Sequence, residues 1–94
     1  MNEPFTVKPG DVIAHFKRDF NTPQDNVAGK YLYQVLCIGN HTETGEPMMV
    51  YQALYAPYAV WVRPLSMVYD PVDKEKYPRA VQEYRFKVIN KEEL

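Results

Sequence analysis

The sequence predicts a mainly β protein, a small antiparallel SH3-like barrel of about five strands with at most one short helical turn. Three observations predict this class. Valine, isoleucine and threonine total 18 of the 94 residues and 13 more are aromatic, whereas alanine and leucine supply only 11; β-branched and aromatic side chains favour strands. Five short apolar runs follow one another between polar segments. The chain is short enough for a single domain, residues 1–94, and closing its sheet would remove exposed edges.

An oligonucleotide-binding barrel is the second possibility, although that fold normally has a clearer helix between its third and fourth strands.

The first third of the chain predicts an arm, a strand, a loop and a central strand. Residues 1–10 hold two prolines without an apolar period, which indicates an extended arm ending in a turn at 9–11. A strand over 11–17 begins the β core, which we expect to span 11–89. Residues 18–30 are rich in turn-forming residues and predict a long exposed loop. Both faces of the strand over 31–39 are largely apolar, so it should lie centrally.

The remaining elements follow from turns and prolines. A polar segment ending in glycine, 40–46, predicts a hairpin between the central strand and the next strand, 47–55. After a turn at 56–59, a short strand over 60–63 must end at Pro64, because proline cannot donate to a ladder. We then expect a helical turn at 65–68, a polar connection over 69–78 and a closing strand over 84–89.

Strand alternation predicts which side chains are buried. Cys37 lies within an apolar strand, so we expect a buried, unreactive thiol. Val60 and Val62 share one face of their strand and are the natural core pair. This arrangement would direct Trp61 and Arg63 outward.

Charge and cysteine content exclude some functions. The 11 basic and 12 acidic residues give a net charge of −1 and are interspersed, so the chain lacks the strong positive field that non-specific nucleic-acid binding uses. A single cysteine cannot form an intramolecular disulfide, which favours a reducing compartment. The sequence has no basic start followed by an apolar stretch and no apolar run of membrane-spanning length. We therefore expect a cytoplasmic protein with no membrane partner.

Several segments resemble one known family. His15-Phe16-Lys17, the strand Tyr33-Gln34-Val35-Leu36 and the later segments 41–46, 50–55 and 61–67 follow one another in an order similar to that of the bacterial family called domain of unknown function 1653. The resemblance spans about residues 15–71. It implies a single compact β-rich bacterial domain and carries over no catalytic residue. Residues 18–30 are longer than the turn expected there, and 56–59 lack the expected glycine.

The leading functional hypothesis is a non-enzymatic binding module. If Tyr51 and Tyr55 lie on the same side as Trp61 and Arg63, they form an aromatic groove with a guanidinium, suited to a peptide, a nucleotide or a single-stranded nucleic acid. Alternatively, Trp61 is simply a large core residue that Arg63 covers. Gln52, on an apolar face, would need a partner such as Arg63, His15 or a ligand.

Two alternatives remain. His15, His41 and Glu43 are titrating groups that a small enzyme or ligand sensor could use. These residues lack the close spacing of a zinc site, so the sequence predicts no metal ligand. It also predicts no catalytic residue and no cofactor. The second alternative is an interaction subunit that dimerises, because its 4 methionines and the strand edge at Pro64 offer apolar surface. The sequence is compatible with either a monomer or a homodimer.

Overall fold

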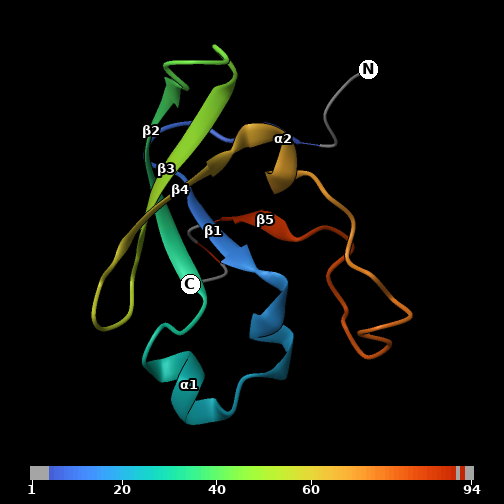
Figure 1. The fold of residues 1–94 in the computed structure, drawn as a ribbon. Helices are drawn as coiled ribbons and strands as arrows, with labels where there is room; N and C mark the ends of the chain where they lie inside the picture. Colours follow the sequence, from blue (N-terminus) through green and yellow to red (C-terminus); the bar gives the residue numbers. More distant parts are fainter. Residues whose placement is uncertain (1–4, 91, 93–94) are drawn as a thin grey trace.

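The computed structural model describes residues 5–90 and 92 and contains one five-stranded antiparallel sheet (Figure 1). The strand order is β4-β3-β2-β1-β5, and the strands are β1 (Val12–His15), β2 (Leu32–Asn40), β3 (Pro47–Ala53), β4 (Val60–Pro64) and β5 (Phe86–Ile89). The mainly β class and the five antiparallel strands are thus confirmed. The predicted barrel is not: β4 and β5 form opposite edges of the sheet, and the sheet does not close.

The segment predicted as a long loop contains short helices. His15 caps the start of the 3-10 helix η1 (Phe16–Phe20), because its ring accepts a hydrogen bond from the backbone of Lys17. The helix α1 (Pro23–Val27) follows, and Thr22 caps it by a reciprocal pair of hydrogen bonds with Asp25. Such a capping box satisfies amides that a helix start leaves unpaired. Some turn-forming residues of this segment therefore cap a helix. Composition alone does not distinguish a helix cap from a turn.

The predicted helical turn at 65–68 is confirmed as α2 (Leu65–Val68). It lies against the face of the sheet that carries Met49 and Tyr51, here called the inner face, and buries Val68. Val7, from the segment predicted as an arm, is also buried in this core. The other members of the core are Ile13, Tyr33, Val35, Met49, Tyr51, Ala53 and Phe86.

A β-bulge changes the faces of β2. Val35 pairs with Tyr51, but the next pair is Cys37 with Val50, so Leu36 is the extra residue. An extra residue reverses the alternation beyond it. Ile38 therefore packs against the core, and Cys37 is exposed on the outer face. The prediction that Cys37 is buried was wrong for this reason.

The faces of β4 also differ from the prediction. Its register pairs Trp61 with Tyr51 and Arg63 with Met49, which places both side chains on the inner face. Val60 and Val62 instead lie on the outer face, where they are 53% and 57% exposed. The prediction of a valine core pair was wrong because pairing with β3, not the valine pattern, decides which face turns inward.

The segment from Tyr69 to Arg85 crosses beside β1 and β5 and is held by side chains from the rest of the chain. Asp19 Oδ2 accepts the backbone amides of Val81 and Gln82, both at 2.9 Å. The buried Gln82 donates from Nε2 to the carbonyls of Ala14, Tyr84 and Arg85. These bonds fix the backbone that leads into β5. Within the described part of the chain, no helix is long and apolar enough to cross a membrane.

Candidate functional site

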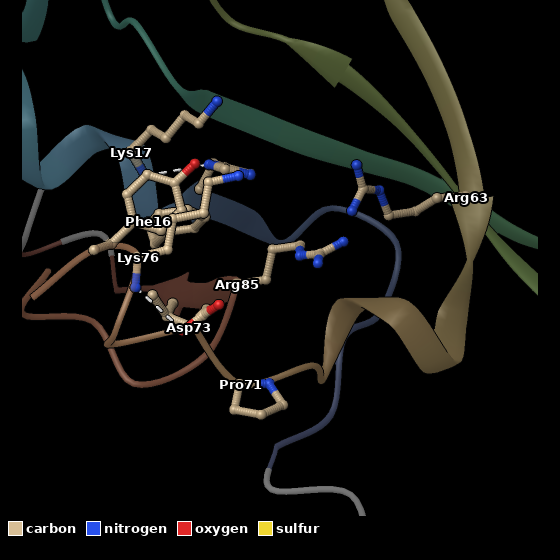
Figure 2. A pocket seen from close by; sticks show the side chains of 10 residues that line it. Phe16, Lys17, Arg63, Pro71, Asp73, Lys76 and Arg85 are labelled. Atoms are coloured by element: carbon tan, nitrogen blue, oxygen red, sulfur yellow. Dashed lines mark hydrogen bonds between the residues drawn. The ribbon is translucent and has the colours of Figure 1, made fainter.

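Two adjoining pockets lie where β1 ends, and they share His15, Lys17 and Arg63 in their walls. The basic pocket has a volume of about 380 Å³ and is bounded further by Asp73, Lys76 and Arg85 (Figure 2). The aromatic pocket has a volume of about 230 Å³, and its rings are those of Tyr31, Tyr33, Tyr51, Trp61 and Phe86. The two adjoining pockets are here called the cleft, of which one has mainly charged walls and the other mainly aromatic walls.

Arg63 is held rigidly between the two pockets. Its Nε donates to the hydroxyl of Tyr51 at 3.0 Å. The guanidinium carbon lies 5.0 Å from the ring centre of Phe86 and 6.0 Å from that of Tyr51, both within cation–π range. Among the described residues, Arg63 Nη1 is buried without a hydrogen-bond partner. A buried donor of this kind costs free energy unless a ligand or water pairs with it.

Arg85 faces Arg63 from the other side of the basic pocket. Its backbone amide donates to the carbonyl of Asp70 at 2.8 Å, and its carbonyl accepts the amide of Phe16 at 2.9 Å. The side chain is less constrained, since its nearest carboxylate oxygen, on Asp70, is 3.9 Å away. Figure 2 shows the guanidinium groups of Arg63 and Arg85 pointing toward one another. Two like charges in this arrangement favour an anion between them.

His15 supplies a neutral hydrogen-bond donor. Its Nδ1 accepts the backbone amide of Lys17 at 3.2 Å, which leaves the proton of the neutral ring on Nε2. Burial lowers the pKa of His15 from 6.5 to about 4, and the positive charges of Arg63, Lys17 and Arg85 add to this effect. At neutral pH the imidazole is therefore uncharged.

The basic pocket carries more positive than negative charge. Four cations line it, Lys17, Arg63, Lys76 and Arg85, against the single carboxylate of Asp73. Asp73 Oδ1 already accepts the backbone amides of Glu75 and Lys76. Although the whole chain has a net charge of −1, the pocket attracts anions locally.

The aromatic pocket presents both rings and hydroxyl groups. Trp61 is 53% exposed, whereas Tyr51 beside it is buried. Tyr31 adopts a φ of 68°, a left-handed conformation uncommon for tyrosine, and its ring lies 5.9 Å from that of His15. The hydroxyls of Tyr33 and Tyr55 are 2.8 Å apart. Burial raises the pKa of Tyr33, and this hydrogen bond adds to the effect.

The structure brings together four of the residues predicted for the site: His15, Tyr51, Trp61 and Arg63. Tyr55 lies behind the aromatic pocket, against Tyr31 and Tyr33. Gln52 lies on the outer face of β3 and donates from Nε2 to the carbonyl of Tyr58 at 3.1 Å, so it does not contact the cleft.

His41 and Glu43 lie at the other end of β2. His15 is close to the beginning of this strand, since Ala14 pairs with Leu32, whereas His41 follows its last residue. Nine strand residues span roughly 25–30 Å, so the structure does not bring His15 together with His41 and Glu43. His41 Nδ1 accepts the backbone amides of Glu43 and Thr44 and thereby holds the hairpin loop. Among the described residues, no three His, Cys, Asp or Glu side chains cluster as metal ligands.

Several residues of the cleft were not predicted as site residues from the sequence, among them Lys17, Tyr31, Arg85 and Phe86. The alternation of basic and apolar residues from Arg85 onward indicates a half-buried strand. It does not indicate which strand lies beside it. Only the pairing of His15 with Phe86 brings the beginning of β5 to the end of β1.

The family comparison matches residues 12–88 to the model described as "Protein of unknown function (DUF1653)". The match covers nearly the whole chain, so the chain belongs to this family, as the resemblance of its motifs indicated. The comparisons with curated proteins and with solved structures gave no match.

Proposed function

We propose that this member of the DUF1653 family is a non-enzymatic binding domain, whose aromatic pocket takes a planar ring of a ligand. The observation that carries the proposal is the position of Trp61. A tryptophan that is half exposed at the mouth of a pocket, with Arg63 and four further rings around it, offers a stacking surface to a partner. Such surfaces are worth about 1–3 kcal/mol for each stacked base.

The dimensions of the cleft favour a small ligand over a long polymer. The two pockets together fall in the range of about 300–1,000 Å³ that is typical of small-molecule sites. Four cations line the basic pocket, and two of them, Lys17 and Arg63, also line the aromatic pocket. Of the ligands considered from the sequence, a nucleotide fits this arrangement better than an extended peptide or strand of nucleic acid.

The use of the aromatic pocket can be tested by titration. Trp61 is the only tryptophan, so its fluorescence reports directly on the cleft. We expect nucleosides and nucleotides to change this emission saturably, and proline-rich peptides to have little effect. Isothermal calorimetry should then show that Trp61→Ala weakens binding about 10-fold, the loss of one stacking contact.

A matched control lies on the same strand. Val62 is as exposed as Trp61 but lies on the outer face, so Val62→Ala should bind like the wild type. The proposal is wrong if no ring-bearing ligand perturbs Trp61, or if the two variants bind equally well.

A further inference from the structure

We infer that the basic pocket binds the phosphate group of a nucleotide whose base occupies the aromatic pocket. This inference rests on the proposed function, because it assigns a ligand class to the same cleft. It adds a second subsite, between Arg63 and Arg85, and identifies the group that this subsite recognises.

The donors of this subsite are unusually free. Arg63 donates a hydrogen bond from Nε to the hydroxyl of Tyr51. Its Nη1 is buried and has no hydrogen-bond partner among the described residues. Within the described part of the chain, the ion pair of Arg85 is a 3.9 Å contact with Asp70. Guanidinium groups bind phosphate oxygens through two parallel hydrogen bonds. A phosphate between them would pair the buried donor and separate the two positive charges.

The charge of the pocket favours phosphate over carboxylate. Four cations face one carboxylate there. A phosphate monoester carries about −1.5 to −2 charges at pH 7 and offers three acceptor oxygens. A carboxylate would neutralise only one charge and leave most of these donors without a partner.

The adjoining aromatic pocket favours a base over the phenol ring of a phosphotyrosine. Besides its rings, this pocket offers polar groups that suit the edges of a base. The hydroxyl of Tyr51 accepts from Arg63 and retains its own proton to donate. The imidazole of His15 is the second donor, through Nε2. A nucleobase has acceptors on its edges, whereas a phenol ring has none.

The test compares three probes at pH 7 by the emission of Trp61 and by calorimetry: adenosine, adenosine 5′-monophosphate and inorganic phosphate. We expect the monophosphate to bind roughly 10- to 100-fold more tightly than adenosine, the range for hydrogen bonds to a charged group. Inorganic phosphate should bind weakly and compete with the monophosphate. Arg85→Gln should remove most of the advantage of the monophosphate over adenosine.

Arg79→Gln is the matched control. It removes the same charge from the chain, but Arg79 is exposed and lines neither pocket. It should bind the monophosphate like the wild type. Thermal unfolding of both variants checks that they remain folded. The substitution removes a long ion pair of 3.9 Å with Asp70, so we expect Arg85→Gln to fold.

Two further probes distinguish the source of the phosphate. A 5′-phosphorylated single-stranded oligonucleotide should bind no more tightly than the monophosphate, because the two pockets together have the volume of a small-molecule site. Tighter binding of that oligonucleotide or of a phosphotyrosine peptide would overturn the assignment to a free nucleotide. If adenosine and its monophosphate bind equally, or if the two arginine variants behave alike, the phosphate subsite is wrong while the proposed function stands. If no probe changes Trp61, both fail.

Discussion

The two ring nitrogens of His15 have different roles, and this difference contributes to the chemistry of the cleft. Nδ1 holds the start of η1 by accepting the amide of Lys17. Nε2 is left as a donor beside Arg63 and Tyr31. Burial and three neighbouring cations oppose protonation of the ring. The residue therefore contributes hydrogen-bonding capacity to the cleft without adding a fifth positive charge.

The lowered pKa of His15 makes the folded protein less stable in mild acid. The pKa is 6.5 in the unfolded chain and about 4 in the folded protein. Between these values the unfolded state binds more protons, so the free energy of unfolding falls as the pH falls from 6.5 toward 4. His15→Asn should remove this dependence while its side-chain oxygen still caps η1. Urea unfolding at pH 7, 6 and 5 measures the difference between the two proteins.

The wild type should lose its stability advantage over His15→Asn progressively as the pH falls. Parallel pH profiles would show that His15 titrates normally in the folded protein.

At the scale of elements, the bulge in β2 separates two surfaces with different roles. Before the bulge, Tyr33 and Val35 contribute to the core, and Tyr33 also lines the aromatic pocket. Beyond it, Ile38 takes the inward position and Cys37 turns out. Bulges re-aim side chains in this way without interrupting the sheet. On the outer face, the register then aligns Cys37, Val50 and Val62 across three strands.

The exposed position of Cys37 predicts rapid chemical labelling of the native protein. Its thiol should react with a disulfide reagent at close to the rate of a free cysteine, without denaturant. Because the side chain is not part of the core, Cys37→Ser should change the free energy of unfolding by no more than about 0.5 kcal/mol. A thiol that reacts only after urea is added would place Cys37 in the core and remove the bulge.

At the scale of the whole molecule, one core joins segments from both ends of the chain. Val7 near the N-terminus, β3 in the middle and Phe86 near the C-terminus all contribute to it. The guanidinium of Arg63 also lies over the ring of Phe86. The core therefore forms the floor of the cleft. Phe5 contacts Tyr69 and Tyr84 and extends this packing to the segment before β5.

The contribution of the N-terminal segment can be measured with two valines. Val7 is 5% exposed, whereas Val27, at the end of α1, is 91% exposed. Val7→Ala should lower the free energy of unfolding by about 1–3 kcal/mol, because it removes buried methyl groups and leaves a cavity. Val27→Ala should stay within about 0.5 kcal/mol of the wild type. Equal effects in urea unfolding would show that residues 5–10 do not belong to the core.

Local patterns in the sequence were sufficient to predict the strands. Alternation and turn residues placed all five strands to within a few residues, and Pro64 marked the end of β4 and the start of α2. The motifs also identified the family. These signals are local, so they do not depend on which strands become neighbours.

Four of the eight residues that the sequence predicted for a site lie together in the structure. Trp61, Arg63, Tyr51 and His15 were selected because aromatic, guanidinium and imidazole groups suit binding, and the structure places them in one cleft. The reasoning about faces was nevertheless wrong for β4, because valines at alternate positions suit an exposed outer face as well as a core. Arg85 could not be predicted at all, since its position depends on distant hydrogen bonds: its amide donates to the carbonyl of Asp70, and its carbonyl accepts the amide of Phe16 and the side chain of Gln82.

By itself, the sequence determined the class of the fold, its strands and the chemical types of the site residues, because each of these depends on neighbours along the chain. The tertiary structure alone decided which face of β4 turns inward, whether the sheet closes and which cations surround Arg63. These features depend on register, on a single extra residue in β2 and on bonds between segments more than 60 residues apart, such as those of Asp19 with Val81 and Gln82. Contacts of this kind leave no period in the sequence.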